Sequence, residues 1–275
     1  MDIESIRVAL SRGTERSGSS VPPILNRIQT IENPPTYNRT NKFTKAFQAL
    51  IDAYGVASYR EMNPAPYTII TFSFLFAIMF GDLGHGTIMM LFGLWMIRKE
   101  KRLEAEKTHN EIWNIFFGGR YIIFLMGCFS IYTGIIYNDI FSKSLNIFGT
   151  HWRIDRNVTD VLNNKFLQLD PKSDEYEKDP YPFGMDPVWQ IAKANKIIFQ
   201  NAYKMKISII FGVVHMIFGV SMAYQNHKYF KRRASILYEF LPQIIVLCSL
   251  FGYMVLLMFI KWNKYAADRP SKFSK

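Results

Sequence analysis

The sequence contains few cysteines and none of the short motifs that mark common enzyme sites. Its two cysteines, Cys128 and Cys248, both lie inside apolar blocks, which excludes a disulfide-stapled scaffold. There is no glycine-rich loop followed by Lys and Ser or Thr, so we expect no ATP hydrolysis by this chain. Histidines and cysteines lack metal-ligand spacing, and there is no nucleophile elbow. The sequence therefore predicts a non-catalytic protein with no metal and no other cofactor.

Residues 1–20 also lack the apolar core of a signal peptide, which predicts a cytosolic N-terminus. The formal net charge is +11, from 33 Lys and Arg against 22 Asp and Glu. A basic chain can bind nucleic acid or face an anionic membrane leaflet. Here the bases gather just outside apolar blocks, within residues 98–102 and 228–233. This position is typical of cytosolic membrane loops, so we expect the lipid bilayer as a partner and no nucleic acid.

Apolar residues are abundant and unevenly distributed. They make up 49% of the chain, with 23 Phe, 15 Tyr and 13 Met, although the mean hydropathy of 0.00 is that of a soluble protein. Blocks such as residues 121–137, 207–224 and 241–260 approach the roughly 20 helical residues that cross a bilayer. The pattern predicts an all-α polytopic membrane protein with about five transmembrane helices and a short cytosolic N-terminal segment.

The first apolar stretch, residues 67–97, is too long for one span and is interrupted by Gly81-Asp-Leu-Gly-His-Gly. A single tilted span would bury Asp82 and His85 at mid-depth, where ionisable groups are most costly. A hairpin of two short spans instead places the three glycines and both ionisable groups in a turn near the far surface. Basic residues on both sides of the stretch favour cytosolic ends. The hairpin is therefore preferred over the single span.

The pattern divides the chain into nine segments. They are a cytosolic N-terminal region (1–62), a hairpin of spans 1 and 2 (63–98), a cytosolic loop (99–118), span 3 (119–138), a luminal loop (139–203), span 4 (204–225), a cytosolic loop (226–236), span 5 (237–262) and a luminal tail (263–275). This topology places the sequon at Asn157 in the lumen, where glycosylation occurs. An amphipathic helix is expected between Phe43 and Tyr54, ending at Gly55.

Ionisable residues at the luminal ends of the predicted spans are candidate site residues. Asp82 and His85 share the hairpin turn, and Asp139 follows span 3 on the same side. A carboxylate and an imidazole near the membrane surface can relay protons, so these residues form a candidate luminal proton path. The alternative is that all three are solvated ends of helices, with Asp82 capping the helix that follows it.

Two predicted spans carry small residues on one helical face, which would let a neighbouring helix approach closely. The faces comprise Ser208, Gly212, His215 and Gly219 in span 4, and Gly127, Ser130 and Gly134 in span 3. A mid-membrane imidazole requires a partner or water, so His215 is a candidate intramembrane polar site. Two interpretations stay open for it, a group that lines a polar cavity or a histidine hydrogen-bonded across the bundle.

Several longer strings in the sequence are distinctive. They include Gly13-Thr-Glu-Arg-Ser-Gly-Ser-Ser-Val-Pro, Phe80-Gly-Asp-Leu-Gly-His-Gly, Tyr137-Asn-Asp-Ile-Phe-Ser-Lys-Ser-Leu-Asn-Ile-Phe-Gly and Tyr181-Pro-Phe-Gly-Met-Asp-Pro-Val-Trp. These strings resemble subunit a of the vacuolar-type proton ATPase. The resemblance extends from about Leu10 to about Lys264. It implies the middle portion of that large membrane subunit, namely the end of its cytosolic region and the first five of its eight membrane helices.

The resemblance also implies a role in the stator of a rotary pump that acidifies organelles. The implied partners are a proteolipid ring and the other pump subunits, with ATP hydrolysis on those other subunits. The implied location is an endomembrane (vacuole, lysosome, endosome or Golgi) or the plasma membrane. The family's essential membrane arginine lies on its last two helices, and no Arg lies within the apolar blocks here. We therefore expect a truncated form; the alternatives are a form without a transport role and an independent small proton or ion carrier.

Overall fold

The computed structural model describes residues 3–18, 20–26, 28, 32–106, 110–153, 176, 177, 179 and 181–264. These residues form helices, loops and two isolated β-bridges, which confirms the predicted all-α class. The helices of the first half are α1 (Ile3–Ser17), α2 (Thr44–Asp52), α3 (Ala65–Phe80), α4 (Leu83–Arg98), α5 (Glu100–Ala105), α6 (Glu111–Gly118) and α7 (Arg120–Tyr137). Those of the second half are η1 (Pro187–Gln190), α9 (Lys193–Tyr229), α10 (Arg233–Ser235), η2 (Ile236–Phe240), α11 (Leu241–Leu247), η3 (Cys248–Gly252) and α12 (Tyr253–Lys264).

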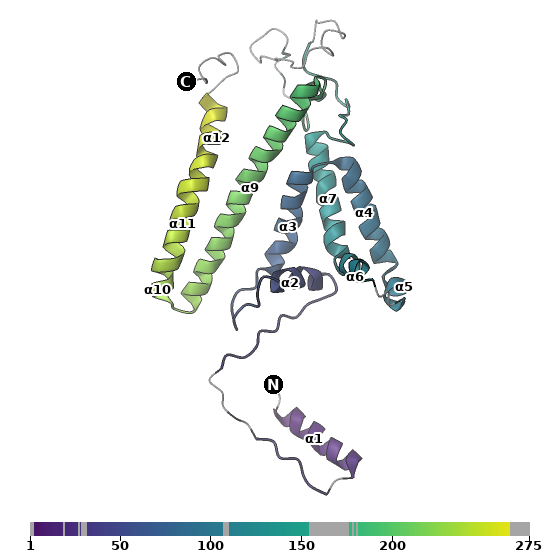
Figure 1. Ribbon diagram of the computed structural model, residues 1–275, viewed down its shortest axis with the longest axis vertical. Coiled ribbons are helices and arrows are strands. Elements are labelled where there is room, and N and C mark those ends of the chain that lie inside the picture. Colours follow the sequence, from purple (N-terminus) through teal and green to yellow (C-terminus); the bar gives the residue numbers. More distant parts are fainter. Residues whose placement is uncertain are drawn as a thin grey trace.

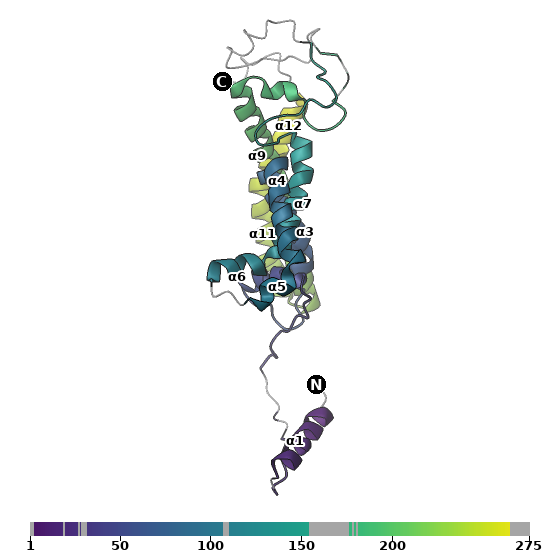
Figure 2. The same ribbon diagram turned by 90° about the vertical axis from the view of Figure 1, so that its right-hand side faces the viewer.

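The long helices rise side by side along the long axis, and short helices lie across the lower end of this bundle in Figure 1. Helix α1 stands apart from the bundle in both Figure 1 and Figure 2, and none of its residues is buried. The amphipathic helix expected between Phe43 and Tyr54 is confirmed as α2, which buries Phe47 and Gln48. We call the two ends of the bundle the upper and the lower end, as they stand in Figure 1.

The chain reverses direction between α3 and α4, as the hairpin interpretation predicts (Figure 1). Helix α3 ends at Gly81, whose φ of 44° lies in the left-handed region that glycine adopts without steric cost. The turn is tighter than expected, because Gly84 and Gly86 lie inside α4 rather than in the turn. A Cβ on Gly86 would lie 2.9 Å from the Cβ of Ser130, so this glycine permits close helix packing.

Helix α7 packs closely against both arms of the hairpin. A Cβ on Gly127 would lie 2.5 Å from the backbone nitrogen of Met90 in α4, so the two helices meet backbone to backbone there. Ser130 is fully buried, and the hydroxyl of Thr133 donates a 2.9 Å hydrogen bond to the carbonyl oxygen of Ala77 in α3. The close approach predicted for the small-residue face of span 3 is therefore confirmed.

Helix α9 begins earlier than predicted. Span 4 was expected to start at residue 204, within a polar loop that ends at residue 203, but the helix starts at Lys193 and extends over 37 residues. Residues 193–203 contain no proline or glycine, so nothing in this segment ends the helix. At 1.5 Å per residue α9 is about 55 Å long, which exceeds the roughly 30 Å of a hydrocarbon core.

The last helices, α10 to α12, form one rod from Arg233 to Lys264, interrupted by the π-helical segments η2 and η3. The rod stands beside α9 at the edge of the bundle (yellow in Figure 1). The rings of Tyr224 and Phe240 join the two at their lower ends, with centroids 4.9 Å apart. Most of the rod's apolar side chains are exposed, Leu250 by 60%, which is typical of a helix surrounded by lipid.

Three helices in the described part of the chain are long and apolar enough to cross a membrane. By length and composition these are Arg120–Tyr137, Ile197–Tyr229 and Arg233–Lys264. Helices α3 and α4 have 16 residues each, and α3 is a predominantly apolar helix that is shorter than the three long ones. The architecture therefore comprises three long apolar helices and a shorter helical hairpin packed against the first of them.

Candidate functional site

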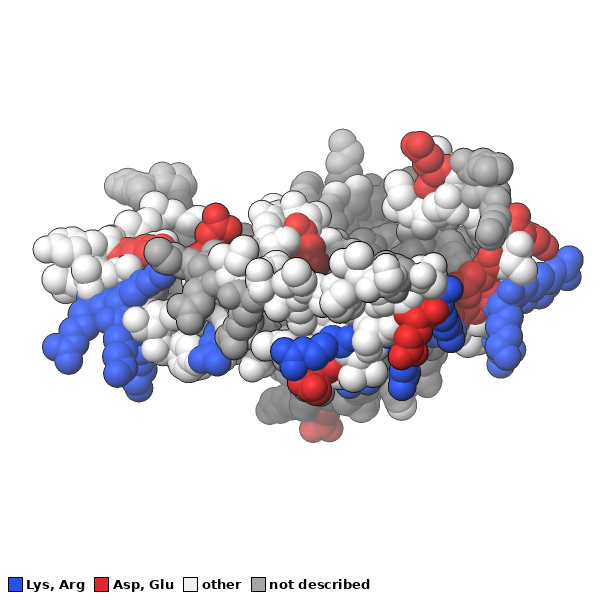
Figure 3. Space-filling model, turned by 90° about the horizontal axis from the view of Figure 1, so that it is seen from below, with Lys and Arg blue, Asp and Glu red and all other residues white. Residues whose placement is uncertain are grey.

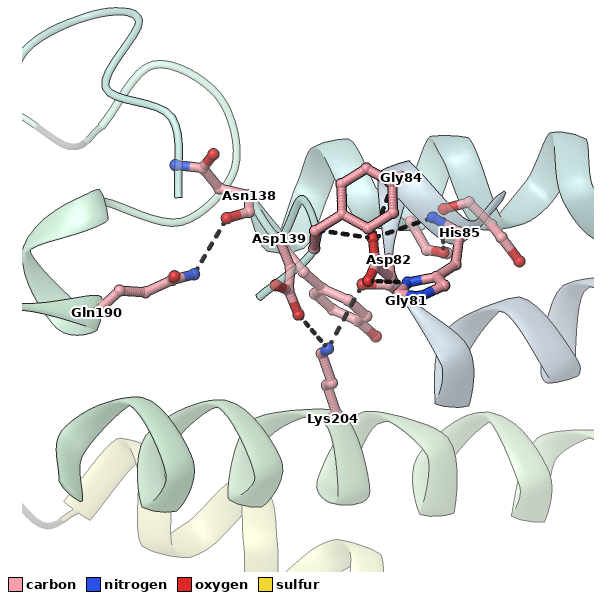
Figure 4. Close-up of polar contacts among 12 residues, drawn as sticks. Gly81, Asp82, Gly84, His85, Asn138, Asp139, Gln190 and Lys204 are labelled. Atoms are coloured by element: carbon pink, nitrogen blue, oxygen red, sulfur yellow. Dashed lines mark hydrogen bonds and ion pairs between the residues drawn. The ribbon is translucent and has the colours of Figure 1, made fainter. Parts of the chain in front are cut away.

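Asp82 connects three parts of the upper end of the bundle. One carboxylate oxygen accepts hydrogen bonds from the backbone N–H groups of Gly84 at 2.8 Å, His85 at 3.4 Å and Phe141 at 3.2 Å. The other oxygen lies 2.6 Å from Nδ1 of His85 (Figure 4). Asp82 therefore caps α4, as one of the two sequence interpretations proposed, and also binds the loop that follows α7.

The surroundings of Asp82 alter the acidity of its side chain, which lies in the turn between α3 and α4. Burial raises the pKa of this carboxyl group, but the hydrogen bonds from His85 and from the backbone of Phe141 and Gly84 favour the charged form more strongly. The net effect is a pKa below the usual value of 3.8. Asp82 is therefore a carboxylate across the pH range of cellular compartments.

Asp139 lies directly after α7 and connects the hairpin to α9. Its backbone oxygen accepts a 2.9 Å hydrogen bond from the N–H of Leu83. Its side chain forms a 3.0 Å ion pair with Nζ of Lys204, which also donates to the carbonyl oxygen of Gly81 at 3.4 Å. Figure 4 shows Lys204 reaching from α9 toward both partners. One lysine thus ties α9 to the hairpin turn and to the end of α7.

These polar groups line a cavity of about 430 Å³ at the upper end, which we call the Asp139 cavity. Its walls are Phe80, Asp82, His85, Asp139, Ser142, Ile197, Gln200, Asn201 and Lys204. Two buried polar atoms on these residues, Oδ1 of Asp139 and Nε2 of Gln200, have no hydrogen-bond partner within the described residues. A cavity of this size and polarity can hold several water molecules, which would satisfy those atoms. The cavity therefore brings two carboxylates and one imidazole to a single surface that water can reach.

The structure brings together three of the five residues singled out from the sequence. Asp82, His85 and Asp139 line one cavity, although Asp139 lies far from the other two in the sequence. Asn157, the sequon residue, lies outside the described residues.

His215 does not join the cavity. It follows Lys204 by three helical turns, about 16 Å further along α9. It lines an apolar groove of about 370 Å³ between α3 and α9, beside Tyr67, Phe211 and Phe218. The side chain is exposed, and within the described residues it makes no hydrogen bond. Within the described residues His215 thus lines no polar cavity and makes no hydrogen bond across the bundle, and its role as an intramembrane polar site stays a prediction.

The close packing predicted for the small-residue face of span 4 is absent. A Cβ on Gly212 or Gly219 would meet nothing within 4 Å among the described residues. Small residues only permit a close approach, so packing on this face stays a prediction that requires a helix outside the described residues.

Sequence reasoning missed Lys204 and Gln200. Both lie on the first turns of α9, a segment that the sequence analysis assigned to the luminal loop and the boundary of span 4. Their spacing of four residues places them on one helical face and would have been a signal once the helix was known to begin at Lys193.

A bundle of long apolar helices with a polar cavity at one end defines a polytopic helical membrane protein. Comparison with known sequences then identifies the protein family. Residues 1–274 match the model of the V-type ATPase 116 kDa subunit family, and the chain belongs to this family.

Curated relatives have the same family name. The chain is 56% identical over 273 residues to mouse "V-type proton ATPase 116 kDa subunit a 1", with 97% of this chain and 32% of the relative covered. It is 56% identical over 269 residues to human "V-type proton ATPase 116 kDa subunit a 4", covering 95% of this chain and 32% of the relative. A Caenorhabditis elegans relative, "V-type proton ATPase 116 kDa subunit a 2", is 51% identical over 284 residues. The chain spans about a third of the length of these relatives.

Proposed function

We propose that the chain forms part of the membrane-embedded stator of a V-type proton-translocating ATPase. The observation that carries this proposal is the family match over residues 1–274, together with identities above 50% to curated V-type proton ATPase subunits. In this role the chain hydrolyses no ATP itself, since hydrolysis belongs to other subunits. Its partners are the proteolipid ring, the remaining pump subunits and the lipid bilayer of an acidifying organelle or the plasma membrane.

In this proposal five helices cross the membrane. Helices α3 and α4, each about 24 Å long, stand alongside α7 over most of its length in Figures 1 and 2, so the bilayer that contains α7 also contains them. Basic residues near the lower end, such as Lys45, Arg98 and Arg232, favour a cytosolic lower end. The segment boundaries are those of the sequence analysis, except that α9 reaches past the bilayer to Lys193. The upper end, with the Asp139 cavity and the segment that contains Asn157, then faces the lumen.

The Asp139 cavity is the luminal proton path of this proposal. Two pairs of ionisable groups line one water-accessible surface, namely Asp82 with His85 and Asp139 with Lys204. An imidazole and a carboxylate at hydrogen-bond distance on a surface that water reaches are groups that can relay protons. We assign the cavity to the exit of protons or ions and to holding the hairpin, α7 and α9 in one arrangement.

An independent proton carrier is the weaker alternative. It would require His215 and the Asp139 cavity to form one route, but about 16 Å of α9 separates them. The groove around His215 is apolar, so no chain of water molecules is expected to connect the two. A truncated form without a transport role is the other alternative, and its partners distinguish it from the stator.

Copurification tests the stator role. The affinity-tagged chain is expressed in cells that contain a V-type ATPase, extracted in mild detergent and purified. We expect proteolipid-ring subunits to copurify and to be absent from a preparation of an unrelated tagged five-span protein. Absence of ring subunits from the tagged preparation would contradict the stator role and favour the form without a transport role.

Proton flux tests the carrier alternative. The purified chain is reconstituted in liposomes that contain a pH-sensitive dye, with and without His215→Ala. We expect flux equal to that of empty liposomes in both cases. Flux that the chain produces and that His215→Ala abolishes would establish the carrier instead.

Labelling from each side of the membrane tests the topology. Asn201→Cys, in the Asp139 cavity, should react with a membrane-impermeant maleimide only from the lumen. Lys45→Cys at the lower end should react only from the cytosol, and the unaltered chain measures the background from Cys128 and Cys248. Labelling of Asn201→Cys from the cytosol would overturn the assignment of the cavity to the lumen.

A further inference from the structure

A second large groove lies at the lower end of the bundle, distant from the Asp139 cavity. Helices α2 and α5 and the junction between α6 and α7 enclose about 830 Å³ of space, which we call the α2–α7 groove. Its walls are mainly apolar and include Ala46, Ala49, Leu50, Ile115, Phe117 and Ile122. A mainly apolar groove of this volume can accept a flexible hydrocarbon chain.

Charged residues stand at the rim of the groove. Lys42, Lys45, Arg120, Glu100 and Glu104 line it, so three cations and two carboxylates leave one net positive charge. Glu100 is already committed, because it pairs with Nζ of Lys42 at 3.0 Å and with Nη2 of Arg120 at 2.9 Å. The hydrogen bond from Lys42 and the charge of Arg120 lower the pKa of Glu100 in spite of its burial, so it stays ionised.

Two cationic groups that line the groove can each form a further ion pair or hydrogen bond. Lys45 is exposed and makes no ion pair within the described residues. The Nε atom of Arg120 is buried and also has no acceptor among them, although its Nη1 and Nη2 atoms bind Phe117 and Glu100. A buried guanidinium N–H without an acceptor is costly, and a phosphate oxygen is an acceptor suited to it. In Figure 3, which views this end, Lys and Arg side chains spread along one long edge of the face.

The helix next to the groove has the character of a membrane-surface helix. Helix α6 lies across the lower end of the bundle and projects sideways from it in Figure 2. Three of its apolar side chains are exposed, Ile112 by 66%, Ile115 by 75% and Phe116 by 50%. The neighbouring Trp113 meets the ring of Trp95 edge to face, with centroids 6.3 Å apart. Exposed apolar residues and tryptophans on such a helix are typical of the boundary between headgroups and acyl chains.

We propose that the α2–α7 groove binds one phospholipid with an anionic headgroup. An acyl chain fills the apolar space between α2 and the start of α7, and the headgroup phosphate contacts Lys45 and Nε of Arg120. The single negative charge of a phosphodiester matches the net positive charge of the lining residues. The lipid would then contact both α2, which precedes the membrane, and α7 within the membrane. It would thereby fix the position of one helix relative to the other. This inference goes beyond the proposed stator role and does not depend on proton transport.

Lipid retention tests this proposal. The full chain is reconstituted in nanodiscs with equal amounts of phosphatidylglycerol and phosphatidylcholine, extracted in mild detergent and analysed by native mass spectrometry. We expect one phosphatidylglycerol to be retained with about fivefold preference over phosphatidylcholine, and Lys45→Gln to lower this preference by about the same factor. Lys101→Gln is the matched control, since it removes an exposed cation outside the groove, and it should change nothing.

A second variant separates the groove from the general surface charge. Ala49→Trp fills the apolar space without changing charge and should abolish the retained lipid. If this variant fails to fold, Lys45→Gln still decides the question, because Lys45 is exposed and its replacement does not disturb packing. Equal retention of both lipids by the unaltered chain, or retention unchanged by Lys45→Gln, would overturn the proposal. Displacement of the lipid by inorganic phosphate would also overturn it, because the groove would then bind only a free anion.

Discussion

Helices α7 and α9 have the same sequence feature and opposite surroundings. Both carry small residues at helical spacing on one face. On α7 that face meets the backbone of α4, with Gly127 against Met90, whereas on α9 the positions of Gly212 and Gly219 face open space among the described residues. A stripe of small residues therefore indicates where a helix can be approached, and it does not specify that a partner is there.

The two helices are held in place by different interactions as a result. Helix α7 is held along its length by close backbone contact and by the hydrogen bond from Thr133 to Ala77. Helix α9 is held by polar contacts near its two ends. Lys204 binds Asp139 near the upper end, and Asn226 accepts a 3.1 Å hydrogen bond from the backbone N–H of Met62 near the lower end. Between them, aromatic rings such as Phe74 and Phe211 make edge-to-face contacts.

The largest effect is expected at the ion pair that holds the upper part of α9. Lys204→Met leaves the carboxylate of Asp139, a buried residue, without its cation, which should lower the free energy of unfolding by about 3 kcal/mol or more. Thermal unfolding in detergent, followed by tryptophan fluorescence, measures the loss. Asp139→Asn combined with Lys204→Met should recover part of it, because no uncompensated charge remains. Lys206→Met is the control; a loss as large as that of Lys204→Met would contradict the importance of the ion pair.

Glycine substitutions test the comparison most directly. Gly127→Leu inserts a side chain where a Cβ already lies 2.5 Å from the Met90 nitrogen, so the α4–α7 contact must open at a cost of about 1–3 kcal/mol. Gly212→Leu on α9 meets open space and should change the stability by less than about 0.5 kcal/mol. The same thermal unfolding assay compares the two variants. Equal losses would show that a partner covers the face of α9.

The hydrogen bond between α7 and α3 should make a smaller contribution. Thr133→Val removes the donor to the Ala77 carbonyl and should destabilise the protein by about 0.6 kcal/mol, the average for such bonds within membranes. Thr87→Val is the matched control, because among the described residues the Thr87 hydroxyl bonds only to the carbonyl oxygen of Leu83 on its own helix. If the two variants lose the same free energy of unfolding in denaturant titrations, the hydrogen bond from Thr133 does not help to hold α7.

The smallest effect concerns pH. The pKa of Asp82 is lower in the folded protein than its usual 3.8, so the stabilisation by its hydrogen bonds is complete above that value. It is lost as the pH falls through the lower, folded pKa. The unfolding temperature should therefore decline on acidification below about pH 4, and Asp82→Asn should remove this part of the dependence. A decline centred well above pH 4 and preserved in Asp82→Asn would show that another group causes it.

Much of the architecture was readable from the sequence. The break at Gly81, the cap by Asp82, the amphipathic α2 and the tight face of α7 all follow from local patterns. The gathering of Asp82, His85 and Asp139 followed from topology alone, since successive spans return the chain to the same side. Lys204 was missed because its role depends on where α9 begins, and the five Lys, Asn and Gln residues within residues 193–203 interrupt the apolar pattern of a span.

The sequence by itself determined where the long apolar segments lie and to which family the chain belongs. These properties depend on the solvent around each segment and on the backbone within a few residues of it. The tertiary structure alone decided that Lys204 meets Asp139, that Glu100 joins Lys42 to Arg120, and that one small-residue face is covered while the other is open. Those contacts join residues far apart in the chain, and their geometry depends on how whole helices pack against one another.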